Sequence, residues 1–301
     1  MTRPHNRRTE GSATGEAEGR GFGAEVPKQP EIGPGEDILL SGGGPTGVYR
    51  RGRVVAKDTG PWAATVHSLL RHLEEVGFTG APRVVGSGFD AAGREVLTYI
   101  EGEFVDTGPW TLEGTAAVGK LLRELHQATA SYRPPPDAIW QPWFCRPLGG
   151  ETRIISHCDV APWNIVARNG LPVALIDWEH AGPVDPLIEL AQACWLNAKL
   201  HDDYVAEIDG LPPLDERARQ LRAIVDGYGL SEKQRRCFFD LIIEFVLHDT
   251  AEQADEAGVT PDTTDLKVDV LGFNPLWALA WRARAAAWLW RHRRTLQNAL
   301  S

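Results

Sequence analysis

The stretch that decides the fold reads Ser-His-Cys-Asp-Val-Ala-Pro-Trp-Asn and covers residues 156–164. It lies between two short apolar runs that are typical of buried strands. His157, Asp159 and Asn164 are therefore crowded into one loop. Turn chemistry explains any one of them alone, because Asp, Asn and His favour turns and often cap backbone groups. Three of them together favour a functional site, and the sequence that follows supports this interpretation.

A hairpin is predicted directly after the loop. Asn169-Gly170 separates two strand-like runs and is a strong signal for a two-residue turn. Pairing outward from this turn places Asn164 opposite Leu175, so Asp177 becomes a diagonal neighbour of Asn164 on the same face. Diagonal Cα atoms lie ~7–8 Å apart, which lets both side chains reach one small cation. Their carboxylate and amide oxygens suit a hard ion such as Mg²⁺, which takes few protein ligands besides phosphate oxygens, and Asp159 lies nearby, so the hairpin geometry is compatible with a metal site.

Composition limits the class of protein. The chain has 301 residues, of which 43% are hydrophobic, which is enough for two domains or lobes. A net charge of −10 argues against nucleic-acid binding; it is compatible with a cationic small-molecule substrate, and it also serves solubility alone. The four cysteines form no C-x-x-C pair, so neither a zinc site nor a disulfide framework is expected. Without a membrane-spanning run or a signal-peptide core, we expect a cytoplasmic protein that binds no membrane. Composition does not determine the oligomeric state.

Patterning along the chain predicts two parts. Residues 1–37 lack hydrophobic periodicity and are predicted to be a disordered tail. Residues 38–104 alternate short strands with Gly-rich turns and contain one long helix, at residues 62–76. Residues 105–301 are mainly helical, with the hairpin as the only expected strand pair. The predicted class is α+β, with a small antiparallel-sheet lobe followed by a larger helical lobe.

The loop and the hairpin also carry a family resemblance. Residues 157–164 fit the H-x-D-x-x-x-x-N catalytic loop of kinases, and Ile176-Asp177-Trp178-Glu179 stands where kinases carry D-F-G. Gly182-Pro183-Val184-Asp185-Pro186 adds a G-x-x-D-P element. Over about residues 38–200 the sequence resembles the aminoglycoside phosphotransferase family, and this resemblance implies a bilobal, protein-kinase-like fold with N- and C-lobes.

The resemblance also implies roles for these residues. Asp159 would accept or orient the proton of the substrate hydroxyl, and Asn164 and Asp177 would hold Mg²⁺ against the phosphates of ATP. His157 would support the loop through hydrogen bonds. Phosphoryl transfer needs little covalent help from a protein, because positioning and charge neutralisation supply most of the acceleration.

A phosphate-binding lid is expected in the first half of the chain. Gly42, Gly44 and Gly47 match G-x-G-x-x-G, a pattern shared by kinases and dinucleotide-binding proteins. A dinucleotide-binding fold would begin a helix at these glycines, whereas residues 48–50 continue as a strand. The kinase interpretation is therefore favoured.

Three further residues are placed by topology. Lys57 ends the next strand, at the position of the kinase lysine that contacts the phosphates, although a solvated lysine at a strand end stays an alternative. Tyr99 and Glu101 follow the last strand of the small lobe, where a kinase hinge offers backbone groups to adenine.

One position departs from the kinase pattern. Kinases pair their lysine with a glutamate of the following helix, but this helix has Val66 and His67 at the expected place, and Glu74 and Glu75 lie too far along it. Another acid pairs with Lys57, or the lysine is positioned differently, or the protein is a weak kinase; the sequence leaves these alternatives open.

The acceptor is expected to be a small-molecule alcohol. No long peptide-binding segment separates Asp177 from the G-x-x-D-P element. The leading hypothesis is an ATP-dependent phosphotransferase, with GTP as an alternative donor, that moves the γ-phosphate to a hydroxyl of an aminoglycoside-like molecule or another metabolite. The alternative is a nucleotide-binding pseudokinase that acts as a regulatory or interaction module.

Overall fold

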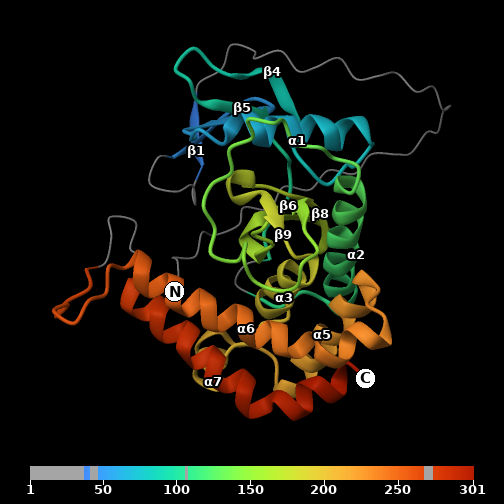
Figure 1. Cartoon of the computed structure of the whole chain (residues 1–301), viewed down its shortest axis with the longest axis vertical. Helices are drawn as coiled ribbons and strands as arrows, with labels where there is room; N and C mark the ends of the chain where they lie inside the picture. The colour runs from blue at the N-terminus through green and yellow to red at the C-terminus, as the bar shows by residue number, and fades with distance from the viewer. Residues whose placement is uncertain (1–36, 41–46, 106–107, 268–273) are drawn as a thin grey trace, which may run out of the picture.

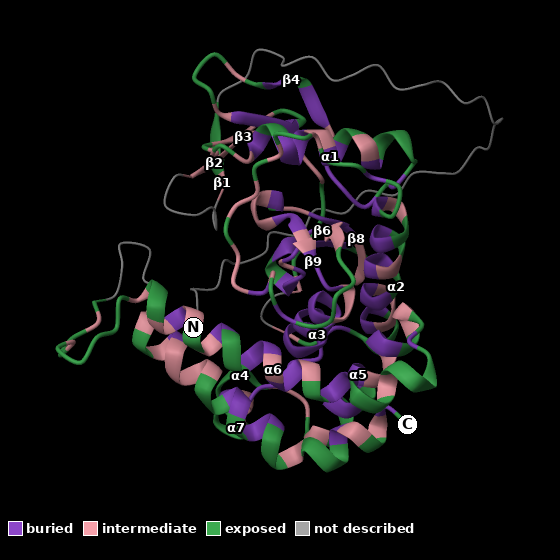
Figure 2. Cartoon of the chain, in the orientation of Figure 1, coloured by how far each residue is buried: buried purple, intermediate pink, exposed green. Residues whose placement is uncertain are grey.

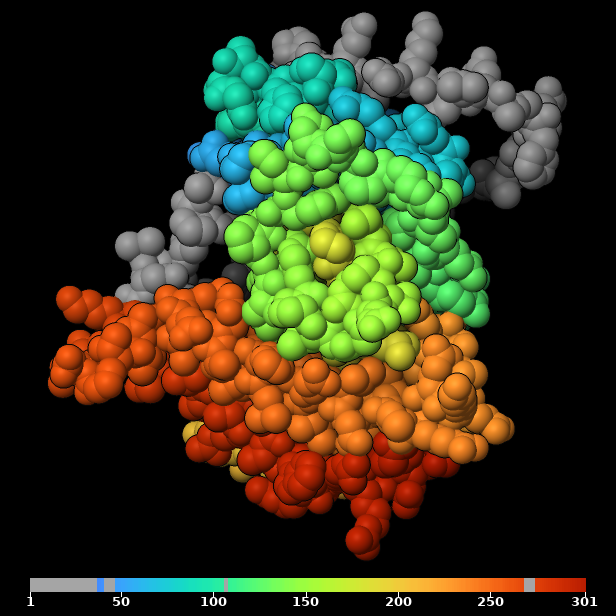
Figure 3. Space-filling view, in the orientation of Figure 1, coloured from blue at the N-terminus to red at the C-terminus, as the bar shows by residue number. Residues whose placement is uncertain are grey.

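The computed structural model describes residues 37–40, 47–105, 108–267 and 274–301. The predicted tail, apart from Asp37, lies outside the described residues, as do Gly42 and Gly44. The chain forms a small lobe around a β-sheet and a large lobe made mainly of helices (Figure 1). In the space-filling view the blue and cyan small lobe lies at one end and the orange and red helices at the other (Figure 3).

The small lobe is a five-stranded antiparallel sheet with one long helix against it. The strand order is β1-β2-β3-β5-β4, so β3 and β5 pair although a helix and a strand separate them in sequence. The helix α1 (Ala63–Glu75) buries Leu69, Leu70 and Leu73 completely, and a left-handed Gly77 follows its end. The strands are β1 (Ile38–Leu40), β2 (Val48–Arg51), β3 (Val54–Lys57), β4 (Val84–Phe89) and β5 (Glu95–Thr98).

The large lobe is built around a buried helix. Figure 2 shows α3 (Pro186–Asn197) almost wholly buried, which is why it lacks a polar face. The backbones of helices α2 and α5 lie in contact at Gly119. A Cβ atom added there would lie 2.0 Å from the carbonyl oxygen of Ile224, so glycine permits this close packing. The other helices are α2 (Leu112–Thr129), α4 (Asp203–Asp209), α5 (Leu214–Tyr228), α6 (Glu232–Glu256) and α7 (Pro275–Ala299). No helix among the described residues is long and apolar enough to cross a membrane.

Two strand pairs lie in the large lobe. The predicted hairpin is present as β7 (Ile165–Arg168) and β8 (Leu171–Leu175), with positive φ at both turn residues, Asn169 and Gly170. The expectation that it would be the only pair is wrong, because β6 (Ile154–Ser156) also pairs with β9 (Gly182–Val184). These two strands are distant in sequence, so no local pattern links them.

The register of the hairpin differs from the prediction. Arg168 faces Leu171 as expected, but a bulge shifts the pairing, and Leu175 faces Ile165 instead of Asn164. Pro172 lies at the shift and has no backbone N–H for a regular ladder. Asn164 therefore lies outside the strand, at the end of the 3₁₀-helix Pro162–Asn164.

The connection between the lobes is attached to the hairpin. The backbone groups of Glu103 and Ala167 exchange two hydrogen bonds of 2.9 and 2.8 Å. Gly102 is needed beside this bridge, because a Cβ atom there would lie 2.4 Å from the Ala167 carbonyl oxygen. The predicted α+β, bilobal architecture is confirmed, while the exact boundary between residues 104 and 105 stays a prediction.

Candidate active site

Asp159 is held through both of its carboxylate oxygens by neutral amides. The Asn164 Nδ2 group donates to Asp159 Oδ2 at 2.8 Å and also to the Asp159 carbonyl at 3.1 Å. The Gln192 Nε2 group, from α3, donates to Asp159 Oδ1 at 2.9 Å, and Gln192 Oε1 accepts from the Val160 amide at 3.2 Å. These hydrogen bonds fix the orientation of the carboxylate, and among the described residues no Lys, Arg or His forms an ion pair with it.

The surroundings of Asp159 raise its pKa to about 7. The main cause is burial, and the negative charge of Asp177 adds to it. The hydrogen bonds from Asn164 and Gln192 act in the opposite direction, because they stabilise the charged form. Asp159 as a whole is half-buried. A carboxylate with a pKa near 7 suits proton transfer at neutral pH.

His157 links the loop to the strand before Asp177. Its Nε2–H donates to the Ile176 carbonyl at 2.9 Å, and its Nδ1 accepts from the Asp159 amide at 3.2 Å. Burial lowers the pKa of His157 and keeps the ring neutral, so one ring nitrogen can donate a hydrogen bond while the other accepts one. His157 therefore supports the loop, as the sequence suggested.

Glu189, from helix α3, fixes the backbone of the loop through a hydrogen bond. Its Oε1 accepts from the Cys158 amide at 2.6 Å, and Cys158 adopts a left-handed conformation with φ of 66°. Its Oε2 lies 2.6 Å from His126 Nε2, and His126 Nδ1 lies 2.8 Å from the Tyr228 hydroxyl. Burial alone would raise the pKa of Glu189, but the contacts with His126, Ser156 and Cys158 lower it, so Glu189 stays ionised.

Lys57 lies among three acids. It forms an ion pair with Asp177, its Nζ atom is 3.6 Å from Glu95 Oε1, and it is 3.9 Å from Glu179 Oε2. Its side chain is only 17% exposed, so the alternative of a solvated lysine at a strand end is wrong. Asp177 reaches Lys57 from a left-handed backbone conformation with φ of 65°.

The charges of Lys57 and Asp177 stabilise one another. Burial alone would lower the pKa of Lys57, but Asp177, Glu95 and Glu179 outweigh it and the net pKa is raised. Burial alone would likewise raise the pKa of Asp177, but Lys57 outweighs it and the net pKa is lowered. Asp177 is therefore a carboxylate at neutral pH, whereas Asp159, with a pKa of about 7, is divided between its protonated and ionised forms there.

Asn164 and Asp177 fit a magnesium ion held partly by phosphates. The Ile176 amide donates to the Asn164 carbonyl at 2.9 Å, which ties the two segments together. The Nδ2 group of Asn164 donates to Asp159, so the Oδ1 atom of Asn164 is the side-chain oxygen that a cation could bind. Among the described residues no three His, Cys, Asp or Glu side chains are grouped to hold a metal by themselves. One carboxylate and one amide oxygen completed by phosphate oxygens match the preference of Mg²⁺.

The remaining predicted residues lie around the small-lobe sheet. Gly47 has a φ of +73° directly before β2, a conformation that favours glycine. The Arg50 guanidinium lies 3.8 Å from the centre of the Tyr99 ring and 3.1 Å from Glu101 Oε1. Both side chains are thus engaged by Arg50, so any contact of this segment with adenine would use its backbone. The assignments of Gly47, Tyr99 and Glu101 stay predictions.

Sequence reasoning missed Glu95, Gln192 and Glu189. Glu95 begins a short apolar run that gives no sign of its partner, because β5 pairs with a strand that is not its neighbour in sequence. Gln192 and Glu189 lie on a helix that shows no polar face from which their direction could be inferred. Glu179, the last residue of the Ile-Asp-Trp-Glu motif, has no role assigned from the sequence and lies beside Lys57.

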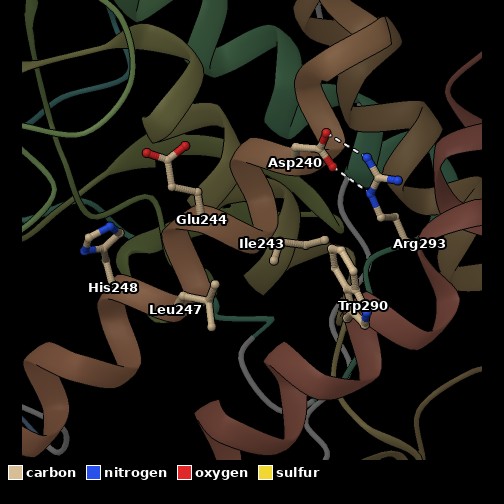
Figure 4. Close-up of a pocket in the computed structure, with 7 residues that line it drawn as sticks. All are labelled: Asp240, Ile243, Glu244, Leu247, His248, Trp290 and Arg293. Atoms are coloured by element: carbon tan, nitrogen blue, oxygen red, sulfur yellow. Dashed lines mark hydrogen bonds and ion pairs between the residues drawn. The ribbon is translucent and has the colours of Figure 1, made fainter.

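A pocket of about 400 Å³ lies elsewhere, between α6 and α7 (Figure 4). The ion pair of Asp240 and Arg293, with a distance of 2.8 Å, lies at its wall. None of the predicted site residues contributes to this pocket. Its lining consists of Asp240, Ile243, Glu244, Leu247, His248, Trp290 and Arg293.

Comparisons with known proteins agree with this geometry. The model of the phosphotransferase enzyme family matches residues 137–239, which contain the loop, the hairpin and α3. The trifolitoxin immunity protein of Rhizobium leguminosarum bv. trifolii is 57% identical over 266 residues, which cover 88% of this chain and 99% of that protein. A choline/ethanolamine kinase family protein from Mesorhizobium loti has a TM-score of 0.55 at 18% identity, covering 88% of this chain and 92% of its own. Amicoumacin kinase in complex with AMP-PNP, Ca²⁺ and Ami has a TM-score of 0.56 at 15% identity, covering 90% of both chains.

The two structural likenesses show a kinase-like fold, here carrying the catalytic-loop motif of a small-molecule kinase. The chain belongs to the phosphotransferase enzyme family.

Proposed function

We propose that the protein is an ATP-dependent phosphotransferase that moves the γ-phosphate to a hydroxyl of a toxin and thereby protects its cell. One observation carries the chemical part of this proposal: Lys57, Asp177, Asn164 and Asp159 form a continuous set in which each member contacts the next directly or through the Ile176 backbone. The order matches the path of the reaction, from phosphates through metal to the hydroxyl. GTP would be an equally suitable donor for this set.

Each residue has a distinct task in the reaction. Lys57 would bind phosphate oxygens, and Asp177 and Asn164 would hold a divalent ion, which supplies neutralisation of the phosphate charge when bound. The acceptor oxygen attacks the γ-phosphorus, and the bond from that phosphorus to the bridging oxygen of ADP breaks. Asp159 takes the proton of the acceptor hydroxyl, so the products are ADP, a phosphate ester and a proton that Asp159 later releases.

The choice of a toxin rests on the relative that is 57% identical. That protein is an immunity protein for trifolitoxin, and the present chain matches 99% of its length. A phosphate added to a hydroxyl changes the charge of a toxin by about two units at neutral pH, which is a plausible route to resistance. A net charge of −10 is compatible with a cationic acceptor and also serves solubility alone, so it does not select the acceptor.

The pseudokinase alternative has lost its support. It rested on the missing helix glutamate, and Glu95 now supplies an acid 3.6 Å from Lys57. Immunity by binding the toxin without modifying it is a separate mechanism, and the ADP-release assay distinguishes it from phosphorylation.

The test is a coupled ADP-release assay with Mg²⁺-ATP. The acceptors are trifolitoxin and panels of aminoglycosides, amino alcohols, macrolides and sugar amines. We expect turnover with one class of acceptor, loss of turnover in Asp159→Asn, and normal turnover in the control Asp215→Asn, whose side chain is 70% exposed. Mass spectrometry of the product should show one added phosphate. Nucleotide and toxin binding without any phosphorylated product would contradict the proposal and favour immunity by sequestration.

A further inference from the structure

Lys57 has a carboxylate partner within its own sheet. In the register of β3 and β5, Lys57 and Glu95 are direct cross-strand partners. Side chains at such positions project to the same face of a sheet with their Cβ atoms ~4.5–5.5 Å apart. The pairing of the strands, rather than the helix, thus brings an acid to Lys57.

The carboxylate of Glu95 is shared between Lys57 and the helix α1. Glu95 Oε1 lies 3.6 Å from Lys57 Nζ, and His67 Nε2 lies 3.2 Å from Glu95 Oε2. The side chains of Glu95 and His67 are 8% and 1% exposed. A buried carboxylate needs charged or hydrogen-bonding partners, and these two contacts supply them.

His67 is itself held firmly. Its ring lies against Phe89 with the ring centres 4.8 Å apart. On another side it contacts Gly88 so closely that a Cβ atom added there would be 2.4 Å from His67 Nδ1. At the position where kinases carry a glutamate, α1 therefore carries a histidine that orients a glutamate of β5.

Glu95 differs from the other two acids around Lys57. Asp177 and Glu179 come from the segment after the hairpin in the large lobe, and Asp177 would be occupied by the metal in the loaded enzyme. Glu95 belongs to the same sheet as Lys57 and would keep its contact there. We propose that Glu95, oriented by His67, is the positioning residue that directs Lys57 toward the nucleotide phosphates, in place of the helix glutamate of kinases. This inference rests on the proposed phosphotransferase function.

The first experiment measures nucleotide binding. Glu95→Gln removes the charge of the side chain at nearly constant shape. We expect it to raise the Kd for Mg²⁺-ATP about 10-fold, which is the effect expected for the loss of one partly buried ion pair. Glu95→Asp should bind more tightly than Glu95→Gln because it keeps the charge. Glu75→Gln, an exposed residue at the end of α1, is the matched control and should bind like the wild type. Equal Kd values for Glu95→Gln and Glu75→Gln, or for Glu95→Asp and Glu95→Gln, would overturn the proposal.

A double-mutant cycle separates positioning from a general effect on the fold. If Glu95 acts only through Lys57, then Glu95→Gln should weaken nucleotide binding in the wild type but hardly at all in the Lys57→Met background. The same loss in both backgrounds would show that Glu95 merely stabilises the small lobe.

A last measurement does not depend on nucleotide. Trace acetylation of Lys57 by acetic anhydride, followed by mass spectrometry across pH, reports how much of the lysine is neutral. Glu95→Gln should shift the labelling curve of Lys57 to lower pH, whereas Glu75→Gln should not. An unchanged curve would refute the link between Glu95 and Lys57. If the wild type does not bind Mg²⁺-ATP, the proposed function fails, and this curve still shows whether Glu95 and Lys57 interact.

Discussion

The two aspartates of the site, Asp159 and Asp177, have the same chemistry and opposite surroundings. Asp159 is held by the amides of Asn164 and Gln192, and burial raises its pKa to about 7. Asp177 is paired with the ammonium group of Lys57, which lowers its pKa. Two carboxylates whose pKa values are driven apart can take separate roles in one site, and the roles proposed here are proton acceptor for Asp159 and metal ligand for Asp177.

The two halves of the site also differ in how they are held. The half around Asp159 is fixed by hydrogen bonds to buried groups of α3, and its loop rests on the ionised Glu189. The half around Asp177 is a cluster of charges that comes from both lobes. We therefore expect substitutions in the first half to alter folding and proton transfer, and substitutions in the second half to alter nucleotide binding.

The largest expected effect comes from exchanging each aspartate for asparagine. Asp159→Asn should lower turnover by about 10²–10⁴-fold and affect Mg²⁺-ATP binding less than Asp177→Asn does, because Asp159 is the proposed proton acceptor and not a proposed metal ligand. Asp177→Asn should remove both turnover and the Mg²⁺ dependence of nucleotide binding. Steady-state kinetics and calorimetric titration measure the two quantities. If both variants lost nucleotide binding to the same degree, the division of roles would be incorrect.

A smaller effect, on stability, is expected at Glu189. Replacing Glu189 by Gln removes the charge that accepts from the Cys158 amide and faces His126, and should lower the free energy of unfolding by about 2 kcal/mol. Urea denaturation measures it. Glu124→Gln, in a surface pair with Lys120 that leaves Glu124 46% exposed, is the control and should change the stability by less than ~0.5 kcal/mol. Equal stabilities of the two variants would show that Glu189 does not support the loop.

The pH dependence of turnover tests the pKa of Asp159. Since its pKa is raised to about 7, Asp159 is protonated and inactive as a base below that pH, so kcat should fall as the pH drops through 7. Gln192→Leu removes a hydrogen bond that stabilises the charged form and should move the midpoint upward by roughly one pH unit. Gln127→Leu, an exposed position on α2, should leave the midpoint unchanged. A downward shift in Gln192→Leu would contradict this assignment.

The smallest effect is expected at Glu101. Its side chain is 77% exposed and pairs with Arg50, so Glu101→Ala should change the KM for ATP by less than about 3-fold if the hinge acts through its backbone. Competition between ATP and GTP in the same assay would show whether Glu101→Ala changes the preference between the two nucleotides. A large increase in KM would mean that the side chain itself binds the nucleotide.

Much of the molecule could be predicted from local sequence. The helix predicted at residues 62–76 and observed at Ala63–Glu75, the turn at Asn169-Gly170 and the α+β division follow from apolar periodicity and turn chemistry, which act over a few residues. The hairpin register could not be predicted beyond Pro172. Pro172 has no backbone N–H for the ladder, but whether this produces a bulge depends on how the opposite strand pairs.

The sequence by itself determined which residues compose the loop and which two residues, Asn164 and Asp177, are proposed to hold the metal, because the motif lies within a short segment of the chain. Only the tertiary structure decided that Glu95 faces Lys57 and that Gln192 reaches Asp159, since both contacts join elements far apart along the chain. It also decided the opposite pKa shifts of Asp159 and Asp177, because burial and neighbouring charges are properties of the packed molecule and not of any residue in it.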